Sequence, residues 1–223
     1  MMSIVIAAYN EEAVIRQTLS TLPYGSNMEV IVVDGASTDK TVELAKQFPV
    51  KVIECSKNRA LQMNKGAGIA SGDILLFLHA DCILEEGALE KIKDCLAKGY
   101  IGGCLSQKIS SDKIIYRFIE ASGNIRARLS KIFYGDQAIF VRRDVFFKLG
   151  GFDNLPLFED ILFSKKLMRE GETAILAKRV FASPRRWQKN GIVKTTVIFW
   201  LLTLGFYLGL PYNRLEGLYR DIR

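Results

Sequence analysis

Short apolar runs alternate with segments of helical spacing along the first 82 residues. The apolar runs, each as long as a buried strand, lie at residues 3–8, 29–33, 50–54 and 73–78. Between them, apolar residues recur at helical spacing, which predicts helices at residues 12–22, 38–45 (with Thr38 as the cap) and 59–70. Strands that alternate with helices form right-handed βαβ units, so the pattern predicts an α/β fold with a mostly parallel sheet flanked by helices.

Beyond residue 82 the alternation is less regular. It predicts helices at residues 85–96, 114–132 and 144–149, and strands at residues 101–109 and 137–141. A further helix opens at Glu159 and Asp160. Acidic side chains are favoured by the positive end of the helix dipole, and this preference is an alternative explanation of both carboxylates.

Polar residues follow three of the four N-terminal strands. They are Tyr9 and Glu11 after the first strand, Asp34 after the second and Asp81 after the fourth. Because the carboxyl ends of parallel strands meet at one edge of a sheet, we expect these side chains to line one crevice. A carboxylate there can hold a hard divalent cation, and the cation can hold a diphosphate. For Asp34, turn formation with Gly35 is an alternative role.

A pair of glycines does not match a dinucleotide-binding fingerprint. Gly66 and Gly68 lie at the end of a predicted helix, whereas the fingerprint lies between the first strand and the first helix. The spacing therefore argues against a nicotinamide-dependent enzyme.

The composition is typical of a globular protein kept in reducing surroundings. The 223 residues include four cysteines, none in a C-x-x-C pair, and we interpret them as structural thiols. No charged segment precedes the first apolar run, so a signal peptide is not expected. We therefore expect a cytoplasmic protein, peripheral to the inner face of the cell membrane if its C-terminal part contacts lipid.

Charge is unevenly distributed near the C-terminus. The net charge is +7, and residues 173–194 contain basic side chains but no acidic one. Residues 195–213 carry no formal charge. This apolar segment has three interpretations: a membrane span, a contact with a membrane surface or a second copy of the chain, or plain core. Nucleic acid is not an expected partner, because the basic cluster lacks a recognition motif.

The order of several short motifs resembles that of the family 2 glycosyltransferases, which have the GT-A fold. The resemblance covers residues 3–187. In chain order, the matching segments are Ile4–Glu11, Val30–Gly35, Ser37–Asp39, Ala70–Asp73, Phe77–Asp81, Gly135–Gln137, Gly150–Phe152 and Glu159–Asp160. The resemblance implies a Rossmann-like nucleotide-binding half and transfer of a sugar from a nucleotide-diphosphate donor, with UDP as the expected nucleotide.

The resemblance also implies roles for the matched residues. Asp81 would hold Mg²⁺ or Mn²⁺ on the diphosphate, and Asp160 would be the catalytic base of a single, inverting displacement. Residues implied in nucleotide-sugar binding are Ala7, Tyr9, Glu11, Asp34, Arg59, His79 and Asp81. Residues implied in contacts with the acceptor or the diphosphate are Asp136, Gln137, Glu159, Arg186 and Trp187, the last either stacking on an acceptor sugar or packing.

Three positions depart from the family pattern. His79 stands at the first carboxylate of the D-x-D motif; because Mg²⁺ prefers oxygen ligands, we expect His79 to contact ribose or phosphate. Ser183 stands at the Gln position of the Q-x-x-R-W motif found in processive members. A polymer synthase is not expected, because the sequence shows no set of membrane spans that could form a pore. Met63 stands where the family has Arg, and we expect Arg59 or Gln62 on the same helix to take over its role.

These predictions divide the chain. Residues 1–190 are expected to form the GT-A domain, with a nucleotide-sugar-binding half at 1–110 and an acceptor half at 111–190. Residues 191–223 are expected to form an apolar, basic helical appendage. The expected acceptor is a glycan or a lipid-linked molecule. Two other functions stay open: a sugar nucleotidyltransferase, or a degenerate protein that binds nucleotide sugars without catalysis.

Overall fold

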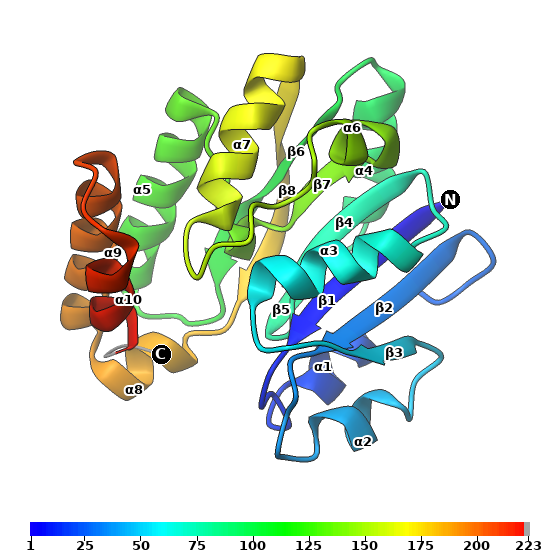
Figure 1. Ribbon diagram of the computed structural model, residues 1–223, viewed down its shortest axis with the longest axis horizontal. Helices are drawn as coiled ribbons and strands as arrows, with labels where there is room; N and C mark the ends of the chain where they lie inside the picture. The colour runs from blue at the N-terminus through cyan, green and yellow to red at the C-terminus, as the bar shows by residue number, and fades with distance from the viewer. Residues whose placement is uncertain (221–223) are drawn as a thin grey trace.

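The computed structural model describes residues 1–220, which fold into one β-sheet with helices on both faces (Figure 1). Within these residues the sheet has eight strands, in the order β3-β2-β1-β4-β7-β6-β8-β5. The strands are β1 (Met2–Ala8), β2 (Met28–Asp34), β3 (Lys51–Glu54), β4 (Ile74–His79), β5 (Cys82–Leu84), β6 (Gly102–Ile109), β7 (Ile139–Arg142) and β8 (Thr173–Ala182).

Strands β1, β2, β3 and β4 form a parallel block. Ala8 of β1 is paired with Asp34 of β2, and Ala7 of β1 with His79 of β4. The three strands therefore end level with one another. The loops that follow them lie at one edge of the sheet, as the sequence predicts.

The second half of the sheet is mixed. Four of the seven described strand pairs are parallel, as predicted, and the three antiparallel pairs all involve β5 or β7. Ala182 at the end of β8 pairs with Cys82 at the start of β5. This pairing brings the residues that follow β8 next to Asp81.

Apolar side chains on the two faces of the sheet form separate cores. Along β1 they alternate: Ile4 and Ile6 face the core under α1, α2 and α4, and Val5 faces the core under α3, α6 and α7. The helices are α1 (Ile15–Ser20), α2 (Thr41–Ala45), α3 (Arg59–Ile69), α4 (Ala88–Ala97), α5 (Ile114–Ser130), α6 (Arg143–Lys148), α7 (Glu159–Glu170), α8 (Arg185–Asn190), α9 (Ile192–Tyr207) and α10 (Tyr212–Arg220), with a 3₁₀ turn, η1, at Gly135–Gln137.

Strand β8 is absent from the sequence-based predictions. Its residues Lys178 and Arg179 made this stretch look like part of a basic cluster. In the structure the Lys178 ammonium donates to the Glu86 carbonyl (2.7 Å) and the Arg179 backbone N–H donates to the Glu85 carboxylate (2.7 Å), while Val180 is buried. Lys178 lies in the bulge between Leu176 and Arg179, whereas Val180 and Ala182 further along the strand reach the core.

The prediction of Thr38 as a helix cap is wrong. Helix α2 begins at Thr41, and Lys40 before it makes no capping hydrogen bond through its side chain. The Thr38 backbone N–H instead donates to Asn10 Oδ1 (2.9 Å), and the Asn10 N–H donates to Ser37 Oγ (2.9 Å). These residues hold the loop after β1 rather than start a helix.

The uncharged segment 195–213 forms most of α9, the turn after it and the start of α10. Leu202 of α9 is buried against Leu157, Leu215 and Tyr219. Among residues 1–220, no helix combines the length and apolar character needed to cross a membrane. The last three residues of the predicted appendage, 221–223, lie outside the described part of the chain.

Helix α3 packs tightly against the sheet at one glycine. A methyl group at Gly66 would lie 2.4 Å from Val5 Cγ1, whereas one at Gly68 would meet nothing within 4 Å. We expect Gly66→Ala to lower the free energy of unfolding by about 1–3 kcal/mol through overpacking. The matched substitution Gly68→Ala should raise it by about 0.5–1 kcal/mol, because alanine favours helix. Chemical denaturation measures both, and equal effects would contradict the close packing at Gly66.

Candidate active site

A cavity of about 590 Å³ lies at the edge of the sheet where β4 and β8 end. One wall comes from α5 and α9, and the opposite wall carries charged side chains. The residues predicted from the sequence that line this cavity are Arg59, His79, Asp81, Asp136, Glu159, Asp160, Arg186 and Trp187. Side chains far apart in the sequence thus converge on one space.

Asp160 is held by two backbone donors. Its Oδ2 accepts from the Gly135 N–H (2.7 Å) and its Oδ1 from the Ile161 N–H (2.7 Å). Burial raises the Asp160 pKa, and the Gly135 N–H and Arg59 oppose the rise. A carboxylate with a raised pKa is a stronger base than a solvated one, and the two N–H groups fix its orientation.

The absence of a side chain at Gly135 leaves room for the His79 ring. A Cβ atom at Gly135 would lie 2.6 Å from His79 Nε2 and 3.7 Å from Asp160 Oδ2. His79 Nε2 is buried without a hydrogen-bond partner among the described residues. Burial, together with Arg59 and Arg186, lowers the His79 pKa well below its ordinary value. The imidazole is therefore neutral near pH 7 and has a nitrogen available for a ligand.

Arg59 links Glu159 to the C-terminal helix. Its guanidinium lies 3.4 Å from Glu159 Oε1 and 3.4 Å from the Tyr219 hydroxyl. Glu159 is 2% exposed, and burial raises its pKa to about 7, with Arg59 opposing the rise and Asp160 adding to it. Burial acts to lower the Arg59 pKa, but Tyr219, Glu159 and Asp160 outweigh that effect and raise it.

Asp136 is the third carboxylate of the cavity and accepts a hydrogen bond from Gln107 Nε2. Burial raises its pKa, Asp160 adds to the rise, and Arg126 opposes it. The Arg126 guanidinium stacks 3.4 Å from the centroid of the Tyr134 ring, which lies next to η1. Arg126 therefore brings a compensating charge from α5 to the buried acids.

Arg185 bridges two predicted donor-site carboxylates. Its Nη2 lies 2.6 Å from Glu11 Oε2 and 3.4 Å from Asp81 Oδ2. Burial raises the Glu11 pKa, and Arg185 opposes the rise. The guanidinium thus supplies positive charge at the carboxylate that the sequence predicts to hold a metal.

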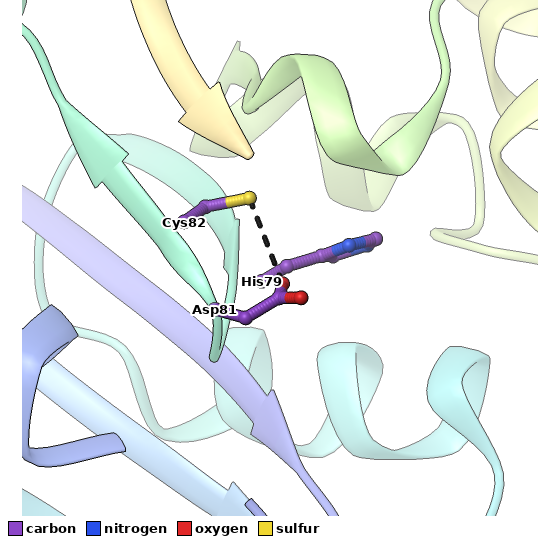
Figure 2. A group of neighbouring side chains, drawn as sticks. All are labelled: His79, Asp81 and Cys82. Carbon is purple, nitrogen blue, oxygen red and sulfur yellow. Dashed lines mark hydrogen bonds between the residues drawn. The ribbon is translucent and has the colours of Figure 1, made fainter. Parts of the chain in front are cut away.

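His79, Asp81 and Cys82 form a candidate cation site at the end of β4 (Figure 2). Their ligand atoms lie within 4.8 Å of one another. Cys82 donates to Asp81 Oδ1 (3.8 Å), and burial and the Asp81 charge raise its thiol pKa well above the ordinary value. Since thiols bind metals as thiolates, Cys82 does not fit. The Asp81 oxygens fit Mg²⁺ or Mn²⁺, and a neutral imidazole suits Mn²⁺ better than Mg²⁺.

The residues predicted to bind the nucleoside lie beside the cavity and do not line it. Asp34 is buried at the end of β2, and its two carboxylate oxygens accept from the Ser37 N–H (2.8 Å) and hydroxyl (2.5 Å). The Lys57 ammonium lies 3.8 Å from the centroid of the Tyr9 ring. Ala7 pairs with His79 in the sheet, so this group adjoins the charged wall of the cavity.

Gln137 and Trp187 both make contacts within the protein. Gln137 Oε1 accepts from the Tyr134 N–H (3.1 Å) and stabilises η1 without lining the cavity. The Trp187 ring packs edge-on between Tyr116 of α5 and Phe199 of α9, and its indole N–H donates to Thr196 Oγ1 (3.3 Å). Trp187 therefore joins the two helices that wall the cavity.

The loops around the site contain strained backbone. Three non-glycine residues with positive φ directly flank predicted site residues: Asn10 (φ 53°), Ala138 (φ 52°) and Phe158 (φ 67°). A fourth, Ala36 (φ 62°), lies two residues after Asp34. Non-glycine residues rarely adopt this conformation, and it persists where the surroundings enforce it, commonly at functional sites.

Several residues of the cavity were not predicted from the sequence. They are Gln107, Arg126, Tyr134, Tyr219 and the cavity-facing residues of α9. The predicted helix at residues 114–132 contains four basic residues, Arg117, Arg126, Arg128 and Lys131, and this charge is the one sequence signal at Arg126. The others lie on a strand face, in a turn or on an apolar helix, where no local pattern marks them.

The chain belongs to glycosyl transferase family 2, whose family model matches residues 3–152. Among curated relatives, it is 30% identical over 146 residues to the dolichol-phosphate mannosyltransferase of Pyrococcus furiosus, covering 58% of this chain and 42% of that protein. The chain spans between 42% and 63% of the length of the first three curated relatives.

Solved structures share the fold. S. aureus TarS in complex with UDP-GlcNAc aligns with a TM-score of 0.65 at 18% identity, covering 82% of this chain and 58% of that one. The mannosyltransferase PcManGT of Pyrobaculum calidifontis, in complex with GDP-Man and Mn²⁺, aligns with a TM-score of 0.65 at 22% identity, covering 81% and 56%. The expectation of a GT-A architecture is confirmed.

The raised pKa of Glu159 predicts a pH effect on stability. The pKa is about 7 in the folded protein against an ordinary value of 4.5, so the folded state binds this proton more tightly than the unfolded state. The resulting stabilisation is present below the ordinary pKa and is lost as the pH rises through about 7. From about pH 5 to pH 8, Glu159→Gln should therefore gain up to about 3 kcal/mol of unfolding free energy relative to the parent.

Denaturant unfolding at several pH values measures this difference. Glu172→Gln, at an exposed carboxylate, is the control and should show no such trend. A difference between Glu159→Gln and the parent that does not change with pH would contradict the raised pKa.

Proposed function

We propose that the protein transfers a sugar from a nucleotide-diphosphate donor to an acceptor hydroxyl, with inversion at the anomeric carbon. The observation that carries the proposal is the Asp160 carboxylate, held by the Gly135 N–H and facing the same cavity as Asp81. In this arrangement Asp160 can accept a proton, while the diphosphate binds at Asp81. Family membership supports this reaction class.

The donor is proposed to lie along the edge of the sheet from Asp34 to Asp81. Its nucleoside would contact Ala7, Tyr9 and Asp34, and its diphosphate would approach His79, Asp81 and Arg186. Arg185, which now pairs with Glu11 and Asp81, is free to turn its guanidinium toward phosphate oxygens. UDP is the proposed nucleotide, although the two fold neighbours carry UDP-GlcNAc and GDP-Man.

A divalent cation is proposed as cofactor, with Asp81 as its protein ligand. Bound there, it would neutralise charge that develops on the leaving diphosphate. His79 is proposed to contact the diphosphate or ribose through its unpartnered nitrogen. Support for the metal comes from the donor set at Asp81 and from Mn²⁺ in the complex of a fold neighbour.

Asp160 is proposed as the catalytic base. The acceptor hydroxyl attacks the anomeric carbon from the face opposite the diphosphate, the bond to the diphosphate oxygen breaks, and the hydroxyl proton passes to Asp160. Asp136, Gln137 and Glu159 are proposed to position the sugar or acceptor, with Gln137 acting through η1. One relative is named a dolichol-phosphate mannosyltransferase, which supports a lipid-linked acceptor over a free glycan.

We also propose that residues 1–190 form the catalytic unit, with residues 191–223 appended. A sugar nucleotidyltransferase is the weaker alternative, because the loop after β1 contains Tyr9, Asn10 and Glu11 rather than a glycine-rich, arginine-containing phosphate loop. A non-catalytic binding protein is disfavoured by the presence of both Asp81 and Asp160.

Asp160→Asn tests the proposed base. The variant keeps the size and the Gly135 contact but cannot accept the proton, so turnover should fall at least about 100-fold while donor binding stays unchanged. Nucleotide release during sugar transfer measures turnover, and a titration with donor measures binding. Glu170→Gln, at the far end of the same helix, is the control and should retain turnover. Near-normal turnover in Asp160→Asn would rule out this role.

Asp81→Asn tests the proposed metal ligand. Thermal shifts with UDP-, GDP-, CMP- and dTDP-sugars, each with and without Mn²⁺, should show one nucleotide class that stabilises the parent protein. At a donor concentration of about 100 times Kd, the free energy of unfolding should rise by about 2.7 kcal/mol. Asp81→Asn should lose the part of the thermal shift that depends on Mn²⁺. The control Asp73→Asn changes an exposed carboxylate at the opposite edge of the sheet and should keep that part of the shift. Identical Mn²⁺-dependent shifts in both variants would exclude Asp81 as the ligand.

A further inference from the structure

Helix α9 exposes large apolar side chains along its length. It carries one charged residue, Lys194, among its 16 residues. One side of the helix is buried against α10 and Leu157 through Leu202. The exposed apolar residues of α9 and the turn after it are Val193, Val197, Trp200, Leu201, Leu204, Tyr207 and Leu208. Their spacing of three, four and seven places them on one face of the helix.

Helix α5 has a second exposed apolar face. Ile114, Phe118, Ile125 and Leu129 follow one another at intervals of four, seven and four residues, which is one stripe of a helix. Phe118 is 71% exposed and Leu129 is 82% exposed. A solvent-facing helix side normally carries polar residues, and extended apolar patches mark interaction sites.

The two helices lie together on one side of the molecule (Figure 1). Trp187 packs against Tyr116 of α5 and Phe199 of α9, so the helices share one buried cluster. Trp200, Leu204 and Tyr207 are exposed and also line the cavity that contains Asp160. The apolar surface of α9 is therefore continuous with the mouth of the cavity.

Cations flank both apolar stripes. Exposed basic side chains lie near each end of α5, at Lys113 and Arg128, and near the start of α9, at Lys189 and Lys194. Residues 183–215 contain no acidic residue. The one acid within α5, Glu120, is buried and accepts from the Ile109 N–H and from Arg117. The exposed Asp112 lies beside Lys113, so the rim carries four exposed cations to one exposed acid and is net positive.

This charge distribution favours a lipid surface over a second copy of the chain. A two-fold dimer brings the same patch of each subunit together, which would place these cations against one another with Asp112 as the single facing acid of each rim. An anionic bilayer offers the complementary pattern, with negative head groups for the lysines and arginines and an apolar layer for Phe118, Leu129 and Trp200.

We propose that α5 and α9 dock the protein on an anionic lipid surface, with the exposed apolar side chains inserted at the level of the head groups. The mouth of the cavity between these helices then faces the lipid. An acceptor anchored in that surface reaches Asp160 with its head-group hydroxyl; this last step rests on the proposed function, whereas docking itself does not.

Vesicle flotation tests the docking surface without donor or acceptor. The protein should float with vesicles of phosphatidylcholine and phosphatidylglycerol and should bind far less to pure phosphatidylcholine. Phe118→Gln with Leu129→Gln removes two exposed apolar side chains outside the cavity and should reduce binding at least about tenfold. Ile69→Gln, an exposed apolar residue at the end of α3, is the matched control and should float as the parent does.

Charge reversal tests the electrostatic part. Lys113→Glu with Arg128→Glu should weaken binding to anionic vesicles by about fivefold or more for each cation lost, and added salt should weaken the parent in the same direction. Undiminished binding of this variant would overturn the proposal of an anionic surface.

The two tryptophans give an independent measurement. Trp187 is buried and Trp200 is 62% exposed, so a blue shift of the fluorescence on adding anionic vesicles reports Trp200. Trp200→Phe should abolish the shift while flotation persists. Loss of donor-dependent turnover with normal flotation would count against the proposed function alone.

Three results would overturn the docking proposal. They are absence of flotation with anionic vesicles, equal flotation of the parent and the Phe118→Gln/Leu129→Gln variant, and a dimer in solution that this variant converts to a monomer. The folded state of each variant is checked by its thermal transition, and Ile69→Gln shows the effect of removing an exposed apolar side chain elsewhere.

Discussion

Three carboxylates, the buried Glu159 and the partly buried Asp136 and Asp160, share one cavity. Their removal from water, to which the charge of Asp160 adds repulsion at Asp136 and Glu159, is the constraint that the surrounding structure must satisfy. Charges removed from water are costly unless opposite charges and hydrogen-bond donors accompany them. The compensating groups come from three separate helices: Arg59 from α3, Arg126 from α5 and Arg186 from α8. The cavity is therefore the place where the two halves of the sheet and the C-terminal helices are held together.

The charges of Glu159 and Asp160 are balanced by different neighbouring groups, so the two carboxylates differ in environment. Glu159 lies against Arg59 in an almost completely buried position, with a pKa near neutrality. Asp160 is held by backbone N–H groups and is partly exposed within the cavity. The positive φ of Phe158 at the start of α7 presents both residues from adjacent positions of one helix turn. A small difference in placement thus gives two adjacent carboxylates different hydrogen-bond and ion-pair partners.

The parallel half of the fold and its edge residues were predictable because their signals are local. Each apolar run has the length of a strand, and a level register follows from βαβ geometry, so Asp34 and Asp81 could be assigned to one edge. The bridge from Arg185 to Asp81 was not predictable in the same way. It depends on β8 pairing with β5, across about 100 residues, and β8 carries cations that hide its strand pattern.

The C-terminal part shows the same limit of local patterns. The absence of charge in residues 195–213 indicated an apolar contact, but not which side of the helix makes it. The structure buries Leu202 and leaves Trp200 exposed two residues away. Thr38 is a further case, since its capping signal is real in isolation and is overridden by the hydrogen bonds between the loops after β1 and β2.

The contact of Arg59 with both Glu159 and Tyr219 has a thermodynamic consequence for α10. One guanidinium serves a carboxylate of the cavity and a hydroxyl of the C-terminal helix, so the two contacts share a single source of positive charge. Whatever changes the charge or position of Glu159 changes the free energy with which α10 is held, and displacement of α10 alters the Glu159 pKa by the same coupling free energy. The charge of Glu159 and the position of α10 are therefore reciprocally linked through Arg59.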